Sequence, residues 1–128
     1  MDKRLIKRLE LWYENEEFDK IIAKILEIPE DERGYHMTSQ LARAYNNIEL
    51  YQEAMELLIS IKKEGINDHS WHFRIAYSYF FLGNFKKALE EFKIAIDLGD
   101  KEPLTKLFLE MSESNLFLEK NYLEEDHT

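Results

Sequence analysis

The 128-residue sequence predicts an all-α protein made of three antiparallel helix pairs and a final capping helix. Apolar residues recur three and four positions apart along most of the chain, which is the spacing of one helix face. Only 4 glycines and 2 prolines occur, and they fall where helices should end, so the connections should be short. Residues 35–68 also align with residues 69–102 without a gap, which indicates an internal repeat.

The first helix pair is expected between residues 2 and 34. Apolar residues follow the helical spacing over Lys3–Glu14 and again over Phe18–Ile28. The second run stops at Pro29, because a proline ring disfavours helical geometry in the residue before it. We therefore interpret residues 2–34 as a degenerate first copy of the repeat.

The two clearer copies, residues 35–68 and 69–102, share small, aromatic and charged residues at matching positions. The identical pairs include Ala42/Ala76, Tyr45/Tyr79, Ala54/Ala88, Glu56/Glu90 and Gly65/Gly99. Each copy should hold two helices, with Gly83-Asn84 as the turn in the second copy. Gly65 is expected to end the second helix of its copy in the left-handed conformation, which glycine adopts without a Cβ penalty, and Gly99 is expected to stop the corresponding helix of the next copy.

A 34-residue period, with alanines where helices cross and a large aromatic residue between them, resembles the tetratricopeptide repeat. Trp71 lies one position earlier relative to Tyr79 than in the family pattern, and Ile66 and Asp100 stand where the family has its closing proline. The resemblance implies a right-handed solenoid of three stacked helix pairs with a non-catalytic, protein-binding role.

The last helix should begin at Pro103 and run to residue 122, because a missing N–H costs nothing at the first helical position. A final repeat would otherwise expose its apolar face to water, so this helix is expected to act as a cap. The whole chain, residues 1–128, is expected to form a single domain. The apolar residues expected to cover the third repeat are Leu104, Leu107, Phe108, Met111 and Leu118.

Composition narrows the possible partners and compartments. The chain has 26 acidic and 17 basic residues, a net charge of −9, which disfavours binding to nucleic acid or to anionic membranes. There is no cysteine, hence no disulfide and no thiol nucleophile. No apolar run approaches the roughly 20 residues that span a bilayer. The first residues lack the continuous apolar stretch of a secretory signal, so a cytoplasmic protein is expected.

No catalytic or metal-binding motif is evident. The four histidines are His36, His69, His72 and His127, and neither an HExxH motif nor a cysteine pair accompanies them. We interpret the first three as polar residues near helix starts. The serines and acidic residues lie outside nucleophile-elbow and phosphate-loop motifs. No cofactor, no metal and no enzymatic activity are therefore expected.

The resemblance implies that the first helix of each pair lines a concave binding surface. Arginine and asparagine side chains can hydrogen-bond a peptide backbone or a carboxylate, and aromatic rings can anchor apolar side chains. The expected partner is thus a protein or peptide segment, and a carboxylate on that segment would suit the arginine side chains. The residues assigned to this surface are Arg43, Asn46, Asn47, Phe73, Arg74, Tyr77 and Phe81.

Several alternatives stay open at this stage. Phe73, Phe80 and Phe81 could instead be covered by the last helix, and Arg43 with its neighbouring asparagines could be ordinary solvated surface. A carboxylate clamp like that of some family members is disfavoured, since only Arg74 matches it and Ser70, Gln40, Ile6 and Glu10 replace its other residues. The chain could also be a self-associating scaffold or a subunit of a larger bacterial assembly.

Overall fold

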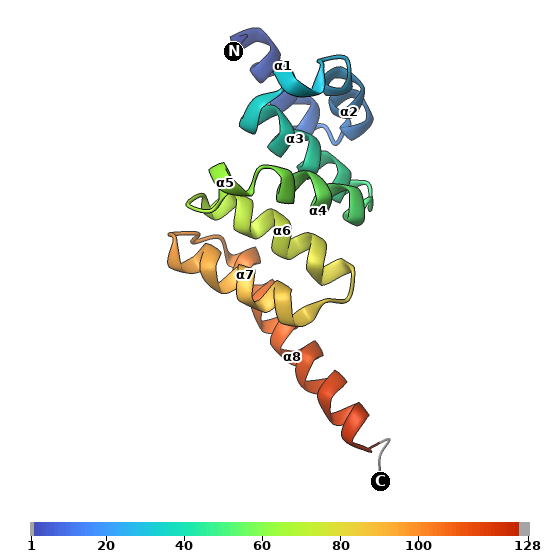
Figure 1. The fold of residues 1–128 in the computed structure, drawn as a ribbon, viewed down its shortest axis with the longest axis vertical. Coiled ribbons are helices and arrows are strands. Elements are labelled where there is room, and N and C mark those ends of the chain that lie inside the picture. Colours follow the sequence, from blue (N-terminus) through green and yellow to red (C-terminus); the bar gives the residue numbers. More distant parts are fainter. Residues whose placement is uncertain (1, 126–128) are drawn as a thin grey trace. The chain divides into compact units, whose positions relative to one another are not determined.

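The computed structural model describes residues 2–125, and His127 lies outside this range. The described residues form eight α-helices and one short 3-10 helix and contain no strand, which confirms the all-α prediction (Figure 1). The helices are α1 (Lys3–Glu14), α2 (Phe18–Leu26), η1 (Glu30–Glu32), α3 (Gly34–Asn47), α4 (Tyr51–Ser60), α5 (Lys62–Gly65), α6 (His69–Phe81), α7 (Phe85–Asp97) and α8 (Pro103–Glu125). Within this range, no helix is both long and apolar enough to cross a membrane.

The chain forms two compact units, which consist of residues 1–61 and 62–128. In the first unit, α1 packs on α2, α2 on α3 and α3 on α4. Asp2 caps α1, because its carboxylate accepts a hydrogen bond from the backbone N–H of Arg4 at 2.9 Å. The buried core residues of this unit are Leu9, Ile21, Ile25, Met37, Leu41 and Ala44.

In the second unit, α6 packs on α7 and α7 packs on α8. Ala76 of α6 and Ala88 of α7 are completely buried, as expected where two helices approach closely. The ring of Phe92 joins them in the core of this unit. The partly buried residues around these three are Phe73, Tyr79, Phe80, Phe108 and Leu109.

The turns inside the three helix pairs share one backbone conformation. Glu16 between α1 and α2, Glu49 between α3 and α4, and Gly83 between α6 and α7 have φ of 57°, 68° and 82°. Glu49 and Gly83 are also matched by the repeat alignment, so the expected turn at Gly83 is confirmed. Two of the three turns place a side chain in a conformation that favours glycine.

The prediction for Gly65 was wrong, whereas that for Gly99 is confirmed. Gly99 has φ 109° in the turn after α7. Gly65 is instead the last residue of the short helix α5 and is not among the described residues with positive φ. A Cβ at this position would lie 2.3 Å from two ring atoms of the buried Trp71. Glycine is therefore needed here for close packing.

The predicted cap exists, but most of the residues assigned to its inner face point outward. Leu104 and Leu107 are each 50% exposed, and Met111 and Leu118 are exposed as well. Of the five predicted covering residues, only Phe108 joins the core of the second unit. The face of α8 that packs is built around the buried Thr105 and Ser112.

Local hydrogen bonds explain why hydroxyl groups lie on the packed face of α8. Asp100 accepts the backbone N–H of Glu102 at 2.9 Å and the Thr105 hydroxyl at 2.8 Å. The Ser112 hydroxyl donates to the Phe108 carbonyl at 2.7 Å. Because these hydroxyls are satisfied within the turn and the helix, their burial carries no unpaired-group penalty. Side-chain hydrophobicity alone therefore predicts the wrong packed face for α8.

Candidate functional site

The predicted binding residues of the first unit lie on α3. The guanidinium carbon of Arg43 is 3.5 Å from the centroid of the Tyr13 ring, and its Nη2 donates to Oε1 of Gln40. A guanidinium over an aromatic ring is attracted by the negative face of that ring. Arg43 is half-buried, and its contact with Tyr13 links α3 to α1. The sequence did not predict this structural contact.

The two asparagines differ in accessibility. Asn46 is only 4% exposed, so its amide is closed to a ligand in this arrangement. Asn47 is exposed, and its Nδ2 donates to the Arg43 carbonyl at 2.8 Å near the end of α3. Of the three residues assigned to this helix, Asn47 presents the most surface to solvent.

The second unit brings three of the predicted site residues together as one aromatic row along α6. The ring centroids of Phe73 and Tyr77 are 6.1 Å apart, and those of Tyr77 and Phe81 are 4.7 Å apart. These are the separations at which tilted or edge-on rings attract each other. Phe81 is 43% exposed, whereas Phe73 and Tyr77 are half-buried.

Phe108 of α8 contacts all three rings of this row. Its ring centroid lies 5.5 Å from that of Tyr77, 6.0 Å from that of Phe81 and 6.5 Å from that of Phe73. It also stacks on Phe92 of α7 at 5.7 Å with an interplanar angle of 13°. The alternative that the last helix covers these rings is therefore confirmed for the edges that pack on Phe108, while Phe81 stays partly exposed to solvent.

Arg74 also lies on α6, follows Phe73 in the sequence and is half-buried, and its backbone carbonyl accepts the Ser78 hydroxyl at 3.3 Å. Arg43 and Arg74 belong to different units. That they contribute to one continuous surface stays a prediction.

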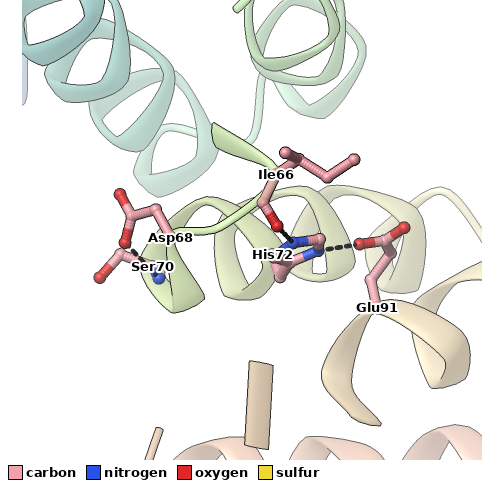
Figure 2. A network of polar contacts seen from close by, with 5 residues as sticks. All are labelled: Ile66, Asp68, Ser70, His72 and Glu91. Atoms are coloured by element: carbon pink, nitrogen blue, oxygen red, sulfur yellow. Dashed lines mark hydrogen bonds and ion pairs between the residues drawn. The ribbon is translucent and has the colours of Figure 1, made fainter. Parts of the chain in front are cut away.

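A polar network that the sequence reading did not anticipate lies in the second unit. His72 is buried in α6, although it was interpreted as a polar residue near a helix start. Its Nδ1 lies 2.6 Å from a carboxylate oxygen of Glu91 on α7, and its Nε2 lies 2.7 Å from the carbonyl oxygen of Ile66 (Figure 2). Asp68 caps the same helix by accepting the Ser70 N–H at 3.0 Å.

Both partners of the His72 ring are hydrogen-bond acceptors. A neutral imidazole can donate from only one nitrogen, whereas the protonated ring donates from both. The charged form therefore satisfies the Glu91 carboxylate and the Ile66 carbonyl together. The network ties α6 to α7 and to the segment that precedes α6, so its role in this geometry is to fix the start of the aromatic helix.

Tyr79 lies near the same carboxylate. Burial raises the pKa of its hydroxyl above the ordinary value of 10.0, and the negative charge of Glu91 raises that pKa further. The Nζ atom of Lys87 lies 5.5 Å from the centroid of the Tyr79 ring. A phenol held in its neutral form beside a carboxylate serves packing rather than proton transfer near neutral pH.

The described part of the chain does not bring histidine and carboxylate groups together as a metal site. Among the described residues, no three histidine or acidic side chains are placed so that they could hold an ion. Glu91 pairs with His72, and the other ring nitrogen of His72 is bonded to the Ile66 carbonyl. Within the second unit, the predicted site residues that lie together on α6 are the aromatic rings of Phe73, Tyr77 and Phe81.

Comparison with solved structures supports the fold. PcrH from Pseudomonas aeruginosa, a helical protein of the tetratricopeptide-like type, matches with a TM-score of 0.60 over 92% of this chain and 93% of the PcrH chain. The two sequences are 17% identical, so the likeness shows the fold alone. No protein-family model and no curated protein sequence matches the chain.

Proposed function

We propose that the chain is a non-catalytic protein-binding module, which holds a peptide or protein segment against the first helices of its repeats. The observation that carries this proposal is the aromatic row of Phe73, Tyr77 and Phe81 on α6. Rigid aromatic rings that are packed at one edge and exposed at the other provide apolar contact area with little loss of side-chain entropy on binding. We place this activity in the cytoplasm as part of the same proposal.

The proposal assigns different tasks to the residues predicted for the surface. Phe81 and Tyr77 supply apolar anchoring, and Arg74 and Asn47 supply hydrogen bonds to a backbone or a carboxylate of the ligand. Arg43 acts mainly through its contact with Tyr13. The buried Asn46 has a structural task.

The test is recovery of a partner followed by titration. The parent protein captures candidates from the native lysate, and purified candidates are then titrated with the parent and with Phe81→Ala. We expect Phe81→Ala to weaken a genuine partner by about 1 to 3 kcal/mol. Leu26→Ala on α2 is the matched control, since Leu26 is similarly exposed and lies outside the surface. Equal binding by Phe81→Ala and the parent would remove the aromatic row from the proposal.

A contribution from a ligand carboxylate has its own test. If Arg74 binds an acidic group, Arg74→Gln should weaken binding and reduce its dependence on salt, because exposed charge pairs are screened. Binding that is unchanged between low and high salt would count against an acidic ligand. It would leave the apolar part of the proposal standing.

Self-association is the second candidate and rests on the apolar residues that the described surface exposes, such as Phe81, Leu107 and Phe117. Sedimentation equilibrium over a wide range of protein concentration separates the two. A concentration-independent monomer favours the binding module. A dimer that Phe81→Ala dissociates would mean that the aromatic row contacts a second copy.

A further inference from the structure

The outer face of α8 carries a stripe of apolar residues, interrupted by Ser114 and Asn115, that the proposed binding surface on α6 does not use. Its residues follow one another three, four or seven positions apart, which places them on one side of a helix. In the last turns they are among the most exposed large apolar residues described, with Leu118 at 63% and Tyr122 at 69%. The stripe consists of Leu104, Leu107, Met111, Leu118 and Tyr122, and Phe117 lies beside it.

The second half of α8 has little support from the rest of its unit. It runs on past α7 (Figure 1), and from residue 113 to residue 122 no side chain is fully buried. Only Asn115, Leu116 and Asn121 are half-buried there. In proteins, most helical stability comes from tertiary packing of an apolar face, so a partner packed on this segment would stabilise it.

The charges that border the stripe are acidic. Glu110 lies one turn from Leu107, and Glu119 lies one turn from Tyr122. Together with Glu113 they are exposed, and within the described part of the chain none of the three forms an ion pair. A shallow hollow lined by Glu113, Ser114, Phe117 and Leu118 places a carboxylate directly beside two apolar side chains.

The charge balance distinguishes the possible occupants. The α8 segment contains two lysines and five glutamates, a net charge of −3. In a symmetric pair of α8 helices, two segments that each have a net charge of −3 would face each other, and their repulsion disfavours such a pair. A helix with lysines or arginines beside its apolar face would instead meet complementary charge along both borders.

From the stripe and its acidic borders we infer that the outer face of α8 docks an amphipathic helix of another protein, whose apolar side is flanked by basic residues. The ligand helix lies along α8, inserts apolar residues between Met111 and Tyr122, and pairs its basic residues with Glu110 and Glu119. This is helix-to-helix recognition through apolar anchors one or two turns apart. The inference is independent of the proposed surface on α6 and would stand if that surface had another role.

The probe is a pair of designed helical peptides of about 20 residues, long enough to lie along α8. Both carry the same leucine stripe, one with lysines beside it and the other with glutamates. Each is labelled with fluorescein and titrated with the full-length protein by fluorescence anisotropy. The lysine peptide should bind at least about tenfold more tightly than the glutamate peptide at low salt.

Two sets of variants locate the binding. Phe117→Ser/Leu118→Ser should weaken the lysine peptide by about tenfold or more, as expected for central apolar anchors. Leu26→Ser on α2 is the matched control. Glu110→Gln/Glu119→Gln should reduce the preference for the lysine peptide, whereas Glu53→Gln/Glu64→Gln, which removes two exposed carboxylates elsewhere, should not. Far-ultraviolet circular dichroism of each variant checks that α8 stays helical.

Three results would overturn the inference. Equal binding of both peptides would remove the charge argument. A lysine peptide unaffected by Phe117→Ser/Leu118→Ser but weakened by Phe81→Ala would place the binding on α6, which supports the proposed function and refutes this site. A parent protein that dimerises, and that Phe117→Ser/Leu118→Ser makes monomeric, would identify a second copy as the occupant.

Discussion

Two neighbouring residues of α8 give the sharpest test of the packing in the second unit. Phe108 contacts aromatic rings of both α6 and α7, whereas the neighbouring Leu107 is 50% exposed. We therefore compare Phe108→Ala with Leu107→Ala. The two variants remove apolar side chains from adjacent positions of the same helix, so differences in helix propensity are small.

The magnitude follows from the contacts of the ring. Truncation of a buried phenylalanine to alanine typically costs about 3 to 5 kcal/mol. Phe108 is half-buried, which lowers this value, but the loss of its stacked and edge-on ring pairs adds to it, so we expect about 3 kcal/mol. Leu107→Ala should change the free energy of unfolding by less than about 0.5 kcal/mol.

The assay is urea unfolding followed by tryptophan fluorescence. The only tryptophans are Trp12 in the first unit and the buried Trp71 in the second. With Trp12→Phe as the common background, fluorescence reports on the unit that contains α8. Equal midpoints for both variants, or a larger loss for Leu107→Ala, would show that the face of α8 assigned to the core is wrong.

Three further predictions concern the second unit. Gly65→Ala should destabilise the protein by about 1 to 3 kcal/mol in urea titration, because the new Cβ meets Trp71, and a stabilised variant would contradict this close approach. His72→Leu should lower the free energy of unfolding by about 2 to 4 kcal/mol, because it leaves acceptors such as the Glu91 carboxylate without their donor. Adding Glu91→Leu should recover part of this loss, and no recovery would mean that the two side chains do not interact. The pKa of Tyr79 is raised in the folded state, so its contribution to the free energy of unfolding is fully present below the ordinary pKa of 10.0 and is lost as the pH rises through the folded pKa. In unfolding titrations above pH 10, Tyr79→Phe should therefore lose less free energy of unfolding than the parent does.

Much of the fold could be predicted from the sequence because helices and their boundaries depend on residues that are close together in the chain. The spacing of apolar residues placed α1 and α2, and glycine or proline marked the boundaries at Gly83, Gly99 and Pro103. These signals depend on backbone conformation and on one-sided burial, which a linear pattern records directly.

The wrong predictions share a different physical origin. The role of Gly65 depends on where the Trp71 ring lies, which is set by packing six residues further on. The inner face of α8 depends on hydroxyl groups that satisfy themselves within the turn and helix, as Thr105 and Ser112 do. His72 meets the Glu91 carboxylate only when α6 packs on α7. Such features follow from three-dimensional contacts and leave no periodic signal.

The candidate binding residues stay predictions, because the structure describes their surroundings and not a bound ligand. The aromatic row of Phe73, Tyr77 and Phe81 does lie along one helix with an exposed end. Its support by Phe108 was not foreseen, since the sequence does not tell which side of α8 turns inward. Whether these rings bind a ligand stays a proposal for the experiments above.

The left-handed turns at Glu16 and Glu49 bear on how independent each helix pair is. A residue with a Cβ in this conformation is less stable than glycine by about 1 to 2 kcal/mol, a cost absent from the corresponding turn at Gly83. The α1–α2 and α3–α4 turns must therefore be held by the packing of the helices around them. Excised as peptides, these two pairs should be poorer autonomous hairpins than α6–α7, whose turn already favours the reversal of the chain.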